Sequence, residues 1–259
     1  MPSFASLSDL AGIAREAVVN LLYRLADDEL VIGHRDSDWS GHAPIHGANV
    51  AFSAMARDEV GHAMVYYQML HDLGEGDPNM LAFGREPRDF RCAALAGLPK
   101  GDWGFSVLRR FLYDAGENVR LAALAESSFI PLARLATKLH GDEKNHLAQG
   151  RKWVLQLGGA GQENRRIMQA ALDAAYPHAL GLFEPTEYDE PLAQAGICPR
   201  EDELQRQWES AVAPVLADAG LSVPEAAPPI YGGRVGRHPT ALKELLDSIK
   251  SVHDTGRTW

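Results

Sequence analysis

The segments Asp58-Glu59-Val60-Gly61-His62 and Asp142-Glu143-Lys144-Asn145-His146 share the pattern Asp-Glu-x-x-His. Each segment lies in a stretch whose apolar residues recur at helical spacing. Residues three apart project from one face of a helix, one turn along its axis, so the Glu and the His of each segment share a face. A carboxylate and an imidazole on one helical face provide half of a metal site. The sequence therefore contains two similar half-sites.

A lone acid precedes each segment by about the length of one helical hairpin. Glu29 stands 30 residues before Glu59, and Asp114 stands 29 residues before Glu143. Each lone acid should therefore meet its partner segment at the same depth of a helical bundle. Glu117 follows Asp114 by three residues on nearly the same face, so either acid is a candidate ligand. The pattern predicts the two-metal site of a ferritin-like four-helix bundle, with the candidate ligands Glu29, Glu59, His62, Asp114 or Glu117, Glu143 and His146.

The types of ligand in this set indicate the metal. Carboxylate oxygens and imidazole nitrogens without thiolates suit two iron or manganese ions better than a structural zinc. Asp58 and Asp142 are candidates to accept the other ring N–H of each histidine and fix its tautomer. The alternative is a bundle in which a polar network fills a former metal site. Asp27 and Asp28, beside Glu29, and Asp36 and Asp38 are expected to be mostly solvated helix-end charges.

The composition bounds the class of protein. The chain has 259 residues, of which 46% are hydrophobic, and a net charge of −10, which argues against a nucleic-acid partner. Cys92 and Cys198 are too few for a disulfide framework and indicate a reducing compartment. No signal-peptide pattern and no apolar run of roughly 20 residues is present. We therefore expect a cytoplasmic protein without a membrane partner.

Periodicity and breaker residues predict an all-α protein. We expect a single ferritin-like domain over 1–259, with a bundle core at about 8–157 and a C-terminal helical extension at about 160–259. The expected helices span about 8–36, 45–72, 102–126, 131–157, 162–183, 201–219 and 240–253, with a short one at 79–83 and a linker at 224–229.

The Gly-rich turn at 230–238 carries Arg234, Arg237 and His238. Backbone amides and cations in such a turn can hold a phosphate, as in a CoA contact. The alternative is a plain surface turn.

Several segments resemble the ring-1,2-phenylacetyl-CoA epoxidase family of bacterial multicomponent di-iron oxygenases. The resemblance spans essentially the whole chain and rests on the segments 25–62, 81–83, 110–115, 150–153 and 232–259, which include Trp39-Ser40-Gly41-His42-Ala43-Pro44 and Arg110-Phe111-Leu112-Tyr113-Asp114-Ala115. The order and length are similar to the smaller ferritin-like subunit of the phenylacetate-degradation complex.

The resemblance implies a partner and a division of labour. In that family the catalytic di-iron centre belongs to a larger homologous subunit, which binds phenylacetyl-CoA and receives electrons from a reductase, while the smaller subunit is a scaffold that has lost ligands. This chain departs from that pattern, because it retains the ligand set of the catalytic relative. Asp114 falls where the third-helix ligand of that relative would lie, which favours it over Glu117.

Three functions follow, and the sequence leaves open whether the chain is itself an enzyme. The first is the smaller subunit of a phenylacetyl-CoA epoxidase, which would be a homodimer alone and a hetero-oligomer with the larger subunit. The second is an oxygenase that acts on an aromatic acyl-CoA in its own right. The third, iron oxidation or storage, is disfavoured because the C-terminal helices would obstruct a cage.

Overall fold

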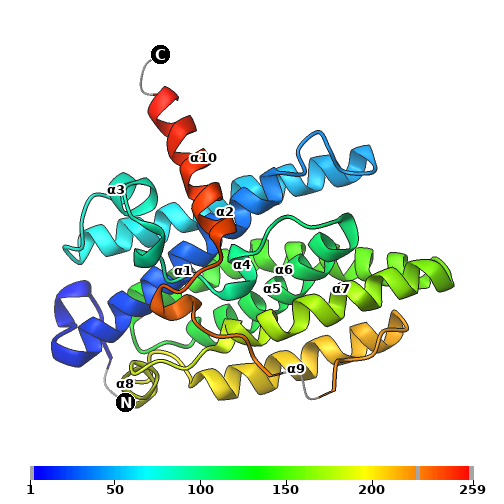
Figure 1. Cartoon of the computed structure of the whole chain (residues 1–259). Coiled ribbons are helices and arrows are strands. Elements are labelled where there is room, and N and C mark those ends of the chain that lie inside the picture. Colours follow the sequence, from blue (N-terminus) through cyan, green and yellow to red (C-terminus); the bar gives the residue numbers. More distant parts are fainter. Residues whose placement is uncertain (1–2, 226–227, 257–259) are drawn as a thin grey trace. The chain divides into compact units, whose positions relative to one another are not determined.

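The computed structural model describes residues 3–225 and 228–256 of the chain. Within these residues the fold is all-α, as predicted, with short 3-10 turns and no strand (Figure 1). The helices follow the order expected of a ferritin-like bundle with additional C-terminal helices. They are α1 Gly12–Ser37, α2 His46–Asp72, α3 Pro78–Phe83, α4 Ala94–Gly97, α5 Trp103–Leu124, α6 Ile130–Gly159, α7 Gln162–Leu180, α8 Asp189–Gln194, α9 Glu201–Asp218 and α10 Thr240–Gly256.

The main differences from the predicted helices lie at α1, α4 and α8. We predicted that the first helix would begin at Ser8, but the chain forms a short 3-10 turn at Leu7–Asp9 and α1 begins at Gly12. Gly12 has a φ of +53°, which a continuous right-handed helix cannot accommodate. The short helices α4 and α8 were not predicted. The predicted linker at 224–229 lies partly, and the C-terminal Trp259 wholly, outside the described residues.

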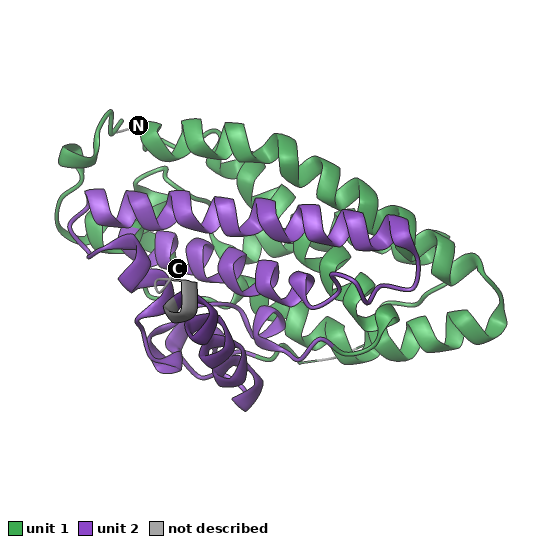
Figure 2. Ribbon diagram, turned by 90° about the horizontal axis from the view of Figure 1, so that it is seen from above, with its two compact units in different colours: residues 1–18, 101–230 green, residues 19–100, 231–259 purple. Residues whose placement is uncertain are grey.

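The chain divides into two compact units (Figure 2). Unit 1 comprises residues 1–18 and 101–230, and unit 2 comprises residues 19–100 and 231–259. The division falls within α1, after Val18, so one continuous helix contributes to both units. The expectation of a single ferritin-like domain stays a prediction.

Unit 1 is built around α5, which packs against α6, α7 and α9. Most residues of α5 are buried, because neighbouring helices cover it on several sides. The indole N–H of Trp208, on α9, donates to the carbonyl oxygen of Leu112 at 2.9 Å. This bond satisfies the polar end of a large buried ring and fixes α9 against α5.

Unit 2 contains α2, most of α1, and the C-terminal helix α10. Helix α10 packs against α3 and buries an apolar stripe that includes Leu242, Leu245 and Ile249. Nη2 of Arg35, near the end of α1, donates to the carbonyl oxygen of Ala241 at 2.7 Å. The C-terminal segment is therefore an integral part of this unit.

Among the described residues, no helix combines the length and the apolar character that crossing a bilayer requires.

Candidate metal centre

The first candidate half-site lies in unit 2, where α1 supplies Glu29 and α2 supplies Glu59 and His62. All three side chains are buried, with exposures of 1%, 0% and 5%. Nδ1 of His62 lies 3.8 Å from Oε2 of Glu29 and 3.9 Å from Oε2 of Glu59. Each residue offers one ligand atom, and these atoms lie within 4.8 Å of one another. The structure thus brings together the three residues that the sequence singled out on these two helices.

A glycine allows the two helices of this half-site to approach closely. Gly33 lies one turn after Glu29, and a Cβ atom at this position would lie 2.9 Å from Cβ of Glu59 and 3.1 Å from the carbonyl oxygen of Ala56. Real Cβ atoms do not tolerate contacts of this length, so any side chain here would push α1 away from α2. Gly33 therefore helps to set the distance between the two carboxylates.

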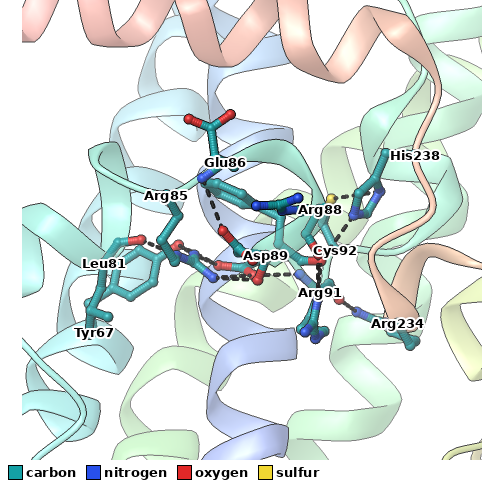
Figure 3. Close-up of polar contacts among 12 residues, drawn as sticks. Tyr67, Leu81, Arg85, Glu86, Arg88, Asp89, Arg91, Cys92, Arg234 and His238 are labelled. Atoms are coloured by element: carbon teal, nitrogen blue, oxygen red, sulfur yellow. Dashed lines mark hydrogen bonds and ion pairs between the residues drawn. The ribbon is translucent and has the colours of Figure 1, made fainter.

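A network of hydrogen bonds fixes α1 just before Glu29. Asp27 accepts hydrogen bonds from the hydroxyl of Tyr67 and the backbone N–H of Arg91, both at 2.6 Å, and forms an ion pair with Arg85. Figure 3 shows these three partners, Tyr67, Arg85 and Arg91. Burial raises the pKa of Tyr67, and the charge of Asp27 raises it further. Burial by itself would lower the pKa of Arg85, but the charge of Asp27, its hydrogen bond and the neighbouring tyrosines together raise it, so the guanidinium stays charged.

Asp28 is fixed by a different set of contacts. It accepts a hydrogen bond from the backbone N–H of Ala93 at 2.6 Å and lies 2.7 Å from Nη1 of Arg234. The same nitrogen of Arg234 donates to the carbonyl oxygen of Arg91 at 2.9 Å. Asp27, Asp28 and Asp36 are 0%, 1% and 0% exposed, so the expectation that they are solvated helix-end charges is wrong, whereas Asp38 is exposed. The partners of Asp27 and Asp28 lie on segments distant in sequence, which the local pattern does not reveal.

In the Gly-rich turn, Arg234 is buried, with an exposure of 4%, so this part of the segment is not a plain surface turn. Its neighbour His238 is half-buried and donates from Nε2 to the carbonyl oxygen of Phe90 at 3.0 Å. Arg237 is exposed. The predicted phosphate contact of these three residues stays a prediction, and the geometry leaves Arg237 as the cation most open to a ligand.

The second candidate half-site lies in unit 1, where α5 supplies Asp114 and α6 supplies Glu143 and His146. Their exposures are 0%, 0% and 5%. Nδ1 of His146 lies 3.2 Å from Oε1 of Glu143. The buried guanidinium of Arg110 joins the two helices, with Nε 2.7 Å from Oδ1 of Asp114 and Nη2 3.0 Å from Nδ1 of His146.

A glycine again lies one turn from a predicted ligand. Gly150 follows His146 by one turn, and a Cβ atom at this position would lie 3.2 Å from Cα of Phe111 and 3.5 Å from Oδ2 of Asp114. The approach of α6 to α5 at Asp114 is therefore close, as the approach of α1 to α2 is at Glu59.

Glu117, the alternative to Asp114, has a different environment. Its Oε1 lies 3.8 Å from Nε of Arg120. Arg120 also binds both carboxylate oxygens of Glu201 at 2.8 Å. Glu117 thus belongs to a buried ion-pair cluster that joins α5 to α9.

The two aspartates expected to orient the histidines are more exposed than the ligands. Oδ1 of Asp58 lies 3.0 Å from Nη2 of Arg57, and its side chain is 31% exposed. Asp142 is exposed. Their hydrogen bonds to the ring N–H groups of His62 and His146 stay predictions.

Sequence reasoning missed the ion pairs that Arg85, Arg110 and Arg234 form with buried aspartates. The Arg110–Asp114 pair could have been predicted, because an arginine four residues before an aspartate on a helix faces that aspartate. Arg85 and Arg234 carry no such local signal, since their partners lie on segments far away in the sequence.

The donor set fits a transition metal. Buried carboxylates are costly unless cations or hydrogen-bond donors compensate them. In unit 2, the ligand atoms of two carboxylates and one imidazole lie within 4.8 Å of one another. This combination of oxygen and nitrogen donors suits iron and manganese.

Comparison with known proteins identifies the family of the chain. A profile of the family described as phenylacetic acid catabolic protein matches residues 6–259. The chain is 29% identical over 239 residues to the C subunit of 1,2-phenylacetyl-CoA epoxidase from Escherichia coli (strain K12), a match that covers 91% of this chain and 96% of the relative. It is 22% identical over 216 residues to the A subunit of the same epoxidase, a match that covers 82% of this chain and 70% of the relative. The chain therefore belongs to the phenylacetic acid catabolic protein family.

Proposed function

We propose that this chain is the smaller component of a phenylacetyl-CoA epoxidase, the counterpart of the C subunit, and that it works in complex with a larger homologous catalytic subunit. The match to the C subunit over 96% of that relative's length supports the assignment, and the match to the A subunit is weaker and covers less of it. In this proposal the complex contains a reductase, and the chain forms a homodimer when the larger subunit is absent.

We also propose that the chain retains a two-metal site for iron or manganese. The observation that carries this proposal is the convergence of Glu29, Glu59 and His62 in the interior of unit 2. The remaining predicted ligands are Asp114, Glu143 and His146, which lie in unit 1. Asp114 is preferred to Glu117 because it shares the Arg110 guanidinium with His146, whereas Glu117 faces Arg120.

The protein's contribution to such a site is to position ligands and exclude water. Bound iron would supply the capacity to activate O₂. Glu29, Glu59 and His62 would hold it through side chains that are at most 5% exposed, so bulk water has little access to their ligand atoms. The networks of Asp27 and Asp28 would hold α1 in the rotation that directs Glu29 toward α2.

Substrate binding is proposed to depend on the larger subunit. An acyl-CoA needs cations for its phosphates, and this chain has a net charge of −10. Of the three residues of the Gly-rich turn considered for this contact, Arg234 forms an ion pair with Asp28 and His238 donates to the carbonyl oxygen of Phe90, which leaves one exposed cation, Arg237. The chain alone is therefore a poor site for CoA.

Elemental analysis tests the metal site. After expression with added iron and anaerobic iron loading, we expect about two metal ions per chain. His62→Ala and His146→Ala should each lose most of the metal, because each removes the imidazole of its half-site. A metal content near zero in the loaded wild-type chain would refute the metal site.

Co-purification tests the assembly separately. The chain and a larger family member are co-expressed, and one of them carries an affinity tag. We expect both chains in the eluate at low salt. Their failure to associate would count against the epoxidase assignment whatever the metal content.

A second candidate function is an oxygenase active without a partner. The specific observation in its favour is that both half-sites are complete, with Glu, acid and His present and buried in each. A single-turnover experiment, with and without the larger subunit, separates the two candidates.

A further inference from the structure

Arg110 occupies an unusual position in the half-site of unit 1. Its side chain is fully buried on α5, at 0% exposure. Its Nε lies 2.7 Å from Oδ1 of Asp114, and its Nη2 lies 3.0 Å from Nδ1 of His146. Glu143 reaches the same imidazole nitrogen, with Oε1 at 3.2 Å from Nδ1. One guanidinium therefore lies against two of the predicted metal ligands.

The direction of the hydrogen bond follows from the chemistry of the two groups. A guanidinium only donates hydrogen bonds and stays protonated in proteins. Nδ1 of His146 must therefore accept, which means that it carries no proton and uses its lone pair toward Arg110. A metal bound through Nδ1 would use this same lone pair, at about 2.0–2.1 Å. Arg110 and a metal ion cannot both occupy it.

The charges lead to the same conclusion. Asp114 and Glu143 place two carboxylates in the interior of unit 1, each at 0% exposure. Arg110 supplies one of the positive charges that such a site needs, and a divalent metal would supply two. We propose that Arg110 is a built-in cation that competes with metal for Asp114 and His146, so that metal enters this half-site only when the guanidinium moves away. This inference rests on the proposed metal site and adds a residue that controls how strongly the site is loaded.

The competing interpretation is that Arg110 is a structural ion-pair residue with no relation to metal. The two interpretations differ in what removal of the guanidinium does to metal binding. If Arg110 is purely structural, its removal should lower the stability of the protein equally with and without metal. If Arg110 competes with metal, its removal should destabilise the metal-free protein and strengthen metal binding.

The experiment compares wild-type chain with Arg110→Gln, using Mn(II) and, under anaerobic conditions, Fe(II). Affinity is measured by titration calorimetry, metal content by elemental analysis, and melting temperature in chelator and in saturating metal. We expect Arg110→Gln to bind metal at least about 10-fold more tightly, since one charge-assisted hydrogen bond no longer opposes binding. Its melting temperature should be lower than that of the wild type in chelator and should rise more on addition of metal.

Arg120→Gln is the matched control. Arg120 is also a buried arginine of α5, and it binds Glu201 through two contacts of 2.8 Å. Its replacement should lower the melting temperature without tightening metal binding.

Each outcome decides between the two interpretations. Equal metal affinity in wild type and Arg110→Gln, with metal bound in both, overturns this inference and leaves the metal site standing. Absence of metal from both chains overturns the metal site as well. If Arg110→Gln folds neither with nor without metal, Arg110→Lys replaces it, because a lysine keeps the charge but cannot bridge Asp114 and His146 as a fork. Tighter metal binding by Arg110→Lys supports the inference, and unchanged binding refutes it.

Discussion

Nη1 of Arg234 lies 2.7 Å from Oδ2 of Asp28, the residue immediately before the predicted ligand Glu29. Both side chains are 2% exposed, so this ion pair joins the C-terminal segment to α1 inside unit 2. The position of a ligand-bearing helix thus depends on a residue close to the other end of the chain.

Removing one partner of this pair should strongly destabilise the protein. Arg234→Met leaves the carboxylate of Asp28 buried without its cation, at a cost of about 3–5 kcal/mol. Urea denaturation measures the change in the free energy of unfolding. The double variant with Asp28→Asn should recover part of the loss. Lys243→Ala is the control, because Lys243 forms an exposed ion pair with Asp247 and its loss should have no measurable effect. Equal effects of the two single changes at Arg234 and Lys243 would contradict this picture.

Two glycines on the helices of the same half-site should respond oppositely to alanine. Gly33→Ala places a Cβ atom 2.9 Å from Cβ of Glu59, so we expect a loss of about 1–3 kcal/mol from overpacking and weaker metal binding. A Cβ atom at Gly61 meets nothing within 4 Å, so Gly61→Ala should gain up to about 1 kcal/mol from helix propensity. Chemical denaturation and metal titration of both variants provide the measurement. A neutral Gly33→Ala would show that α1 and α2 need no such close contact.

Acidification should destabilise unit 2 through His238. Burial lowers the pKa of this imidazole below its ordinary value of 6.5. Its Nε2 donates to the carbonyl oxygen of Phe90, and its Nδ1, 3.8 Å from Sγ of Cys92, accepts from the thiol. Burial also raises the pKa of Cys92, which keeps the thiol protonated.

A histidine whose pKa is lower in the folded than in the unfolded state stabilises the folded protein at pH values above its unfolded pKa, and this contribution is lost as the pH falls. Stability should therefore decrease below about pH 6.5.

The pH dependence can be assigned by substitution. Melting temperatures of the wild type and of His238→Gln are compared between about pH 7.5 and pH 5, the range in which histidine titrates. We expect a shallower decline for His238→Gln, with a remaining slope from His34 and His178, whose pKa values burial also lowers. His42→Gln, at an exposed turn, is the control and should follow the wild-type curve. An unchanged slope in His238→Gln would assign the acid sensitivity to other groups.

Turnover should require the larger subunit. Reduced, iron-loaded chain is mixed with phenylacetyl-CoA and O₂ in a single-turnover experiment, with and without the partner, and the product is quantified by mass spectrometry. We expect product only in the presence of the partner. Stoichiometric product from the chain alone would instead establish an independent oxygenase, and its loss in Glu59→Ala would assign the chemistry to this site.

The sequence by itself determined the helices and the faces that they present. Apolar periodicity located the long helices, and the spacing within Glu59-x-x-His62 and Glu143-x-x-His146 placed each acid and imidazole on one face. The i,i+3 geometry is a property of one helix and needs no tertiary information. Glu29 and Asp114 were singled out from the matching hairpin lengths, and the structure brings Glu29 to Glu59 and His62.

Only the tertiary structure decided which charges are buried and what compensates them. Asp27 and Asp28 resemble surface acids in the sequence, yet they bind Arg85 and Arg234 in the interior of unit 2. Arg110 resembles one more polar residue of α5, yet it lies against His146 of another helix. Local patterns do not reveal such pairs, because an ion pair depends on the distance between side chains in space, and packing fixes that distance only after distant segments have come together.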